Sequence, residues 1–205
     1  MLIRARQFGF NMVEIAVTLA VLGILVATAA PSMADWMRGT QIRNLAETTQ
    51  NGLQRARMEA MKRNQVVTFW LVSPNTTTSP DGSCALASDS AAWVVSMDNP
   101  ATACDTAPST TVAPRIVEVF GPGKSASAIL VEATAADGTA ASSISFNGYG
   151  QPVRSGKPLT KIDMTHSASD TRRLRVEISA SGSIRMCDRG YDPAAVPRDP
   201  RACTS

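Results

Sequence analysis

The first thirty-one residues constrain this chain most, because they contain a long apolar run. The run extends from Phe10 to Ala30 and follows a short basic leader that ends in glycine. It is about long enough to cross a bilayer as a helix, yet it contains one carboxylate, Glu14. An acid at the centre of a membrane helix costs about 2.5–3.5 kcal/mol on insertion scales. We therefore expect Glu14 to have a charged partner and a function.

This segment resembles the N-terminus of a type IV prepilin. In that pattern a glycine precedes the apolar run, and a glutamate is the fifth residue of the mature chain; Gly9, Phe10 and Glu14 occupy these positions. Asn11-Met12-Val13 replaces the usual Thr-Leu-Ile. The resemblance implies cleavage between Gly9 and Phe10 by a prepilin peptidase on the cytoplasmic side, and N-methylation of Phe10. In a filament, Glu14 of an entering subunit would then neutralise the Phe10 amine of its neighbour.

Two other interpretations of the N-terminus remain open. A secretory signal peptide would use Arg4 and Arg6 as its basic region and Ala27-Thr28-Ala29 as its cleavage site. A plain membrane anchor would be held with its start in the cytoplasm by the same two arginines. Neither interpretation requires Glu14, and a carboxylate inside the apolar region argues against the signal peptide.

Helical patterning continues beyond Pro31, which would be residue 22 of the mature chain, where type IV pilins often carry a proline. Proline bends or breaks a helix, so the sequence predicts one long helix, kinked at Pro31, to about Arg63. Three- and four-residue steps define one apolar face of its second half: Ile42, Leu45, Ala46, Thr49, Leu53, Ala56, Ala60 and Met61. The opposite face carries charges: Arg43, Glu47, Arg55, Arg57, Glu59 and Lys62. Gly52 interrupts the helix and weakens it by about 1 kcal/mol relative to alanine.

Short alternating segments separated by turn residues follow and predict strands. They cover 66–72, 93–97, 115–119, 129–133, 143–146, 174–179 and 183–187. Asp137-Gly138, Asn147-Gly148 and Ser181-Gly182 are turn signals. The stretches 74–90 and 100–114, rich in serine, threonine, proline and alanine, and the tail from Asp188 are expected to be loops.

Four cysteines lie beyond the apolar segment: Cys84, Cys104, Cys187 and Cys203. An even number in an exported region is typical of disulfides, and three pairings are possible. We favour Cys84–Cys104 and Cys187–Cys203, because each closes a short loop. A zinc site is the alternative, although no C-x-x-C spacing occurs and His166 is the single histidine. We expect no metal and no cofactor.

Four further segments resemble the GspH/FimT-like minor pilins. The end of the helix, 55–64, is similar to the family's Ala-Arg-x-Glu-Ala run, and 93–98 to its tryptophan strand. The segment 144–152 is similar to its Phe-x-x-x-Gly turn, and 182–187 to its C-terminal hairpin. DNA-capturing members carry Gly-Arg-x-Arg in that hairpin, whereas this chain has Gly182-Ser183-Ile184-Arg185. Only Arg185 matches the motif's arginines.

Charge gives weak support to a nucleic-acid partner. The formal net charge is +3, but two arginines lie in the leader, so eighteen basic and seventeen acidic side chains remain after cleavage. Arginines nevertheless cluster near the C-terminus, and a patch there would contact phosphates. The candidate DNA contacts are Arg185, Arg189, Arg198 and Arg201. The alternative is a solvated charged face.

Catalysis has little support in the sequence. His166 lies near Asp163 and Asp170, but no G-x-S-x-G elbow accompanies them, and we interpret 164–169 as a solvated loop. We expect no catalytic residue, and an enzyme carrying a signal peptide is the most remote interpretation.

The sequence thus predicts an α+β fold, with a long N-terminal helix packed on an antiparallel sheet domain. We expect a leader at 1–9, a transmembrane and assembly half at 10–31, an amphipathic half at 32–64, and a periplasmic β-rich domain at 65–205. The expected function is a minor type IV pilin in the inner membrane and then the pilus, assembling through its helix with other pilins. The alternatives are a DNA-binding minor pilin for DNA uptake and a minor pseudopilin of a type II secretion system.

Overall fold

The computed structural model describes residues 11–73, 79–123, 126–168, 172–195 and 199–204. The chain divides into two compact units, Met1–Met37 and Arg38–Ser205. One helix, α1 (Met12–Arg63), begins in the first unit and ends in the second. The expected α+β class is confirmed, with this helix and antiparallel strands.

The ends of α1 follow from asparagines beside it. At the N-terminus, the Asn11 carbonyl accepts hydrogen bonds from the amides of Glu14 and Ile15, as expected of an N-cap residue. At the C-terminus, Asn64 adopts a positive φ of 50°, a conformation that asparagine tolerates better than most residues. The Gln65 amide then donates to the Ala60 carbonyl and closes the last turn.

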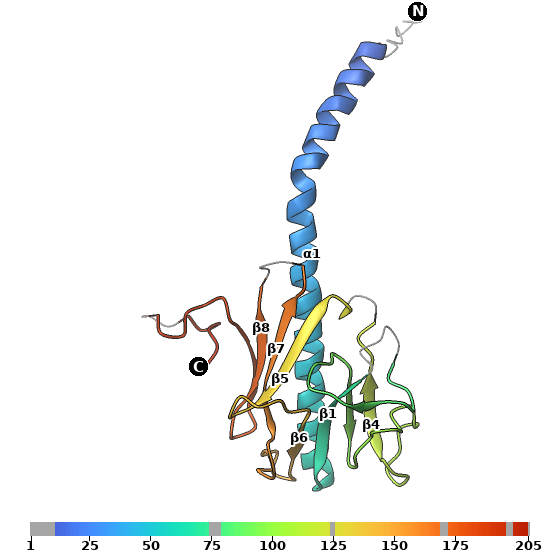
Figure 1. Cartoon of the computed structure of the whole chain (residues 1–205), viewed down its shortest axis with the longest axis vertical. Coiled ribbons are helices and arrows are strands. Elements are labelled where there is room, and N and C mark those ends of the chain that lie inside the picture. Colours follow the sequence, from blue (N-terminus) through green and yellow to red (C-terminus); the bar gives the residue numbers. More distant parts are fainter. Residues whose placement is uncertain (1–10, 74–78, 124–125, 169–171, 196–198, 205) are drawn as a thin grey trace, which may run out of the picture. The chain divides into compact units, whose positions relative to one another are not determined.

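Among the described residues of the second unit, nine strands form two antiparallel sheets (Figure 1). In the first sheet, β1 pairs with β2, β3 and β6, and β4 pairs with β3; the second sheet has the order β5-β7-β8-β9. The strands are β1 (Val67–Ser73), β2 (Ala85–Leu86), β3 (Trp93–Ser96), β4 (Ile116–Phe120), β5 (Ile129–Ala135), β6 (Ser143–Phe146), β7 (Leu159–His166), β8 (Leu174–Ile178) and β9 (Ile184–Asp188).

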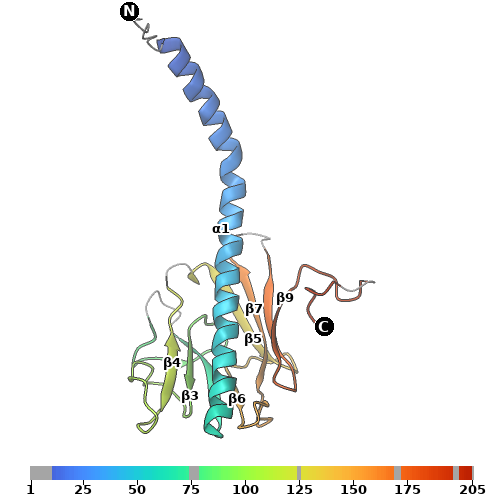
Figure 2. The ribbon, with the colours of Figure 1, turned by 180° about the vertical axis from the view of Figure 1, so that it is seen from behind.

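The main core lies between the second half of α1 and the two sheets, which Figure 2 shows from the helix side. Trp93 is its largest buried side chain, with ring centroids 5.5 Å from Phe69 and 5.2 Å from Phe120. A Cβ on Gly52 would lie 2.8 Å from the Trp93 ring. Gly52 therefore allows α1 to approach β3 closely, and this packing opposes its cost in helix propensity.

The helix face differs from the predicted one at two positions. Seven of the eight expected core residues are buried, whereas Met61 is 43 % exposed. Glu59 was expected on the charged face and is only 3 % exposed. Its carboxylate remains charged and buried because Arg63, Arg55 and Lys62 surround it.

Two strands were not predicted. The two-residue strand β2 lies within a segment expected to be a loop, and it is too short to show a pattern. The interpretation of 164–169 as a loop was wrong for its first three residues, which belong to β7. The register of β5 and β7 shifts near Thr160, between the pairs Thr134–Lys161 and Ala135–Leu159. This irregularity breaks the alternation of period two that identifies strands.

Candidate assembly site

The first unit presents apolar side chains on every side of α1. The large apolar residues Met12, Val13, Ile15, Val17, Leu19, Val21, Leu22, Ile24, Leu25 and Val26 are all 48 % exposed or more. The hydroxyls of Thr18 and Thr28 donate to helix carbonyls of Ile15 and Leu25, at 2.9 and 3.0 Å. Both of these threonine hydroxyls therefore have a hydrogen-bond partner within the helix. Length and composition make this helix a candidate membrane span.

Glu14 is exposed in the first turn of α1. Within the part of the chain that the structure describes, its carboxylate forms no ion pair. Gly9 and Phe10, the expected processing site, lie outside the described residues. The α1 backbone is helical through Pro31, so this proline does not end the helix.

Three elements of the second unit meet at the Gly150 carbonyl. Arg57 Nε of α1 donates to this oxygen at 3.0 Å. Gly182, in the turn between β8 and β9, packs against the same carbonyl, and its φ is +81°. A Cβ on Gly150 itself would lie 2.8 Å from Met61 Sδ. The helix end, the turn after β6 and the last hairpin are therefore joined by close backbone contacts.

The C-terminal tail is fastened to the second sheet at several points. The Asp188 amide donates to the Arg201 carbonyl at 2.8 Å, and a parallel bridge pairs Asp188 with Ala202. The Cys187–Cys203 disulfide joins the tail to β9. Glu177 of β8, 6 % exposed, accepts hydrogen bonds from the amide and hydroxyl of Thr204.

Glu177 stays ionised despite its burial. Burial raises the pKa of its carboxyl, but the two hydrogen bonds from Thr204 and the charge of Arg185 outweigh that effect and lower the pKa. Its oxygens lie close to the sulfurs of Cys187 and Cys203. Those sulfurs are in a disulfide and offer no thiolate to a metal ion.

The Cys84–Cys104 disulfide lies on the other face of the first sheet. Both half-cystines are buried in a second, smaller apolar cluster with Val72, Val94 and Ile116. This pairing confirms the favoured prediction for these two cysteines. The disulfide joins the residue before β2 to the segment between β3 and β4.

The family model of the type II transport protein GspH matches residues 45–182. The chain belongs to this family. The matched range contains the last part of α1, strands β1 to β8 and the turn at Gly182. It therefore includes Arg57, Gly150 and Gly182, whose atoms meet at the Gly150 carbonyl.

Two crystal structures of the type IV minor pilin FimU from Pseudomonas aeruginosa resemble this chain. One covers 80 % of this chain and 96 % of its own, with 14 % identity and a TM-score of 0.47. The other covers 79 % and 99 %, with 14 % identity and a TM-score of 0.43. No curated protein matches the chain.

The arginines predicted to contact DNA are paired with acids where the structure describes them. Arg185 binds Glu177 at 3.1 Å, Arg189 binds Asp163 at 3.3 Å, and Arg201 binds Asp199 at 2.9 Å. The guanidinium of Arg201 also lies 4.1 Å from the centre of the Tyr191 ring. Arg198 lies outside the described residues. These pairs reduce the positive charge that the three arginines offer to phosphates, and DNA binding stays a prediction.

The geometry of strand β7 keeps the side chain of His166 away from that of Asp163. Asp163 and His166 are three residues apart on one strand, which favours opposite faces of the sheet. The Asp163 carboxylate accepts two hydrogen bonds from Arg175, at 2.7 and 2.8 Å, and His166 Nδ1 accepts one from the Ala168 amide. Asp170 lies outside the described residues. Sequence reasoning did not find Arg175, whose place opposite Asp163 depends on the pairing of β7 with β8.

Proposed function

We propose that this chain is a minor type IV pilin, a structural subunit that acts by packing in a filament. The observation that carries the proposal is the apolar surface on every side of the first half of α1, interrupted by Glu14. Such a surface suits a bilayer first and then the interior of a helical filament, where other subunits replace lipid. We place the chain in the inner membrane with its sheets in the periplasm, and later in the pilus, in a tip or priming complex.

Assembly on this proposal requires processing between Gly9 and Phe10. Cleavage creates a new amine on Phe10, four residues before Glu14, and a neighbour's Glu14 can neutralise it in lipid. We expect the mature chain to begin at N-methylated Phe10. Intact-mass and N-terminal analysis of the protein extracted from membranes checks this. A mature chain beginning at Ala30 or Pro31 would show that a signal peptidase removes the whole apolar run.

Glu14→Ala tests the assembly role. The variant should reach the membrane in at least the normal amount, because its insertion no longer buries a charge. It should be missing from sheared filaments, because the neighbour's amine lacks its partner. Immunoblots of the membrane and sheared fractions measure both quantities.

Thr18→Ala is the matched control for Glu14→Ala. It lies one turn further along α1, and its hydroxyl bonds within its own helix, so the variant should enter filaments normally. Normal incorporation of Glu14→Ala would remove the pairing argument. If both variants are missing from the sheared filaments, any change in this segment blocks assembly.

A minor pseudopilin of a type II secretion system is the second candidate, favoured by the description of the matching family as a type II transport protein. The two candidates use the same helix, so they separate by phenotype. A deletion strain should lose surface pili if the first candidate holds, and should lose protein secretion while keeping its pili if the second does.

A further inference from the structure

A hollow of about 470 Å³ opens on the second unit between the β6–β7 connection, the last hairpin and the C-terminal tail. Its wall is largely apolar, with Ile144, Pro152, Pro158 and Ile178 among its lining residues. The volume lies in the range of sites that hold small ligands or short peptide segments.

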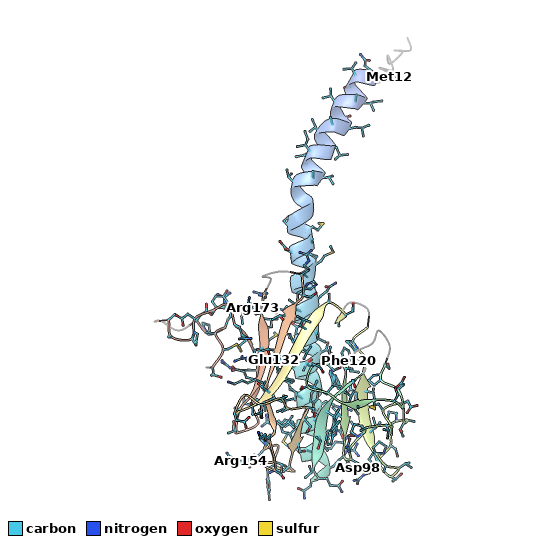
Figure 3. All side chains as sticks on the ribbon, viewed as in Figure 1. Met12, Asp98, Phe120, Glu132, Arg154 and Arg173 are labelled. Carbon is cyan, nitrogen blue, oxygen red and sulfur yellow. A yellow bond between two sulfur atoms is a disulfide. The ribbon has the colours of Figure 1, made fainter. Side chains whose placement is uncertain are left out.

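Three cations and one carboxylate line this hollow. Lys161, Glu177 and Arg185 form a row across β7, β8 and β9, because Glu177 pairs in register with both neighbours. Arg154 joins them from the β6–β7 connection, and Figure 3 shows it at the end of the domain where β6 lies.

One oxygen of the Glu177 carboxylate already accepts hydrogen bonds from within the chain. Nε and Nη2 of Arg185 and the Thr204 hydroxyl all donate to the same oxygen of Glu177, Oε2. Arg185 also donates to the Ala202 carbonyl at 3.1 Å. Glu177 and Arg185 therefore hold the tail and cancel each other's charge.

Lys161 and Arg154 differ from Arg185 in their ion pairing. Among the residues that the structure describes, neither forms an ion pair, although Lys161 is half-buried. Lys157, on the same connection as Arg154, pairs with Asp137 at 3.1 Å. The hollow thus carries two positive charges that the described part of the chain leaves uncompensated, beside an apolar wall.

We propose that this hollow binds an acidic segment of a neighbouring subunit, in which a carboxylate lies beside an apolar side chain. Lys161 and Arg154 would bind the carboxylate, and the proline and isoleucine side chains would pack against the apolar neighbour. A partly desolvated lysine such as Lys161 binds a carboxylate more strongly than a fully exposed one does, and the exposed Arg154 adds a second positive charge beside it. The partner's identity as a subunit rests on the proposed function, whereas the binding chemistry does not.

Two peptides test the proposal by calorimetry on the full chain in a non-ionic detergent, with peptide-into-detergent heats subtracted. The probe is acetyl-Ala-Glu-Leu-Glu-Ala-amide, and its neutral counterpart carries glutamine in place of both glutamates. We expect the acidic peptide to bind with a dissociation constant below about 1 mM. The neutral peptide should bind at least about tenfold more weakly, because hydrogen bonds to charged groups are the stronger ones.

Variants locate the binding. The double variant Lys161→Gln/Arg154→Gln should lose at least about tenfold in affinity, whereas Lys157→Gln, which removes a nearby but paired cation, should bind as the wild type does. Equal affinity for both peptides, equal loss in the control, or no binding at millimolar concentration would each overturn the proposal. Displacement by millimolar phosphate as effective as by the peptide would also overturn it, since it would show a site for any anion.

This experiment is independent of the filament assay. Peptide binding can fail while incorporation still depends on Glu14, which would leave the proposed function intact. Binding can also succeed in a chain that never enters pili, which would leave the site intact.

Discussion

Replacing Gly182 by alanine should lower the free energy of unfolding by roughly 2–5 kcal/mol. A left-handed backbone costs a residue with a Cβ about 1–2 kcal/mol, and overpacking typically adds about 1–3 kcal/mol. Both effects act here, because φ is +81° and the new Cβ would press on the Gly150 carbonyl. Urea unfolding of the full chain in detergent, followed by tryptophan fluorescence, measures the loss.

Gly138→Ala separates these two effects. Gly138 also has a φ of +81°, but no atom lies within 4 Å of its would-be Cβ. This variant should therefore lose only the backbone contribution, about 1–2 kcal/mol. Equal losses in the two variants would mean that the contact between the last hairpin and the Gly150 turn does not stabilise the domain.

Removing the Cys187–Cys203 disulfide, with Cys187→Ala and Cys203→Ala together, should cost about 3 kcal/mol for a loop of this length. The sequence separation is 16. The tail should also detach first, so the Asp188 and Thr204 amides should exchange hydrogen faster than in the wild type. Non-reducing peptide mapping of the wild type should give Cys84–Cys104 and Cys187–Cys203 before the variant is made.

Thr204→Val is the matched variant for the tail. It keeps the shape of the side chain and the amide donor but removes the 2.6 Å hydroxyl bond to Glu177, a loss of roughly 1–2 kcal/mol.

A disulfide variant as stable as the wild type would refute the expected cost of removing the Cys187–Cys203 bond. Free thiols or crossed pairs in the peptide map would refute the pairing itself.

The sequence predicted the elements whose signals are local and regular. The helix end, the core face from Ile42 to Ala60 and seven of the nine strands follow from periodicity, because buried side chains repeat with the geometry of the element. The period failed for β7, where an irregularity near Thr160 shifts the alternation.

Long-range contacts were beyond the sequence. The sequence predicted that Gly52 weakens the helix. No local pattern shows that the Trp93 ring lies against this glycine. Glu59 was expected on the charged face of the helix, but it is buried and three basic side chains surround its carboxylate. A patch of the C-terminal arginines was one of two interpretations, the other being a solvated charged face, and no local pattern shows that strand register brings Arg185 opposite Glu177. The Gly52–Trp93 contact and the Arg185–Glu177 pair depend on residues distant in sequence or on strand register, whereas the three partners of Glu59 lie within four residues of it on α1.

The C-terminal tail bound to β9 affects how copies of this domain can lie beside one another. An exposed outer strand offers unpaired amides and carbonyls to any extended chain nearby, and proteins usually cover or interrupt such edges. Here the Asp188 amide donates to the Arg201 carbonyl and Asp188 pairs with Ala202, so the tail covers the end of the outer side of β9. Copies of this domain can then lie close together without joining through this edge into a continuous intermolecular sheet.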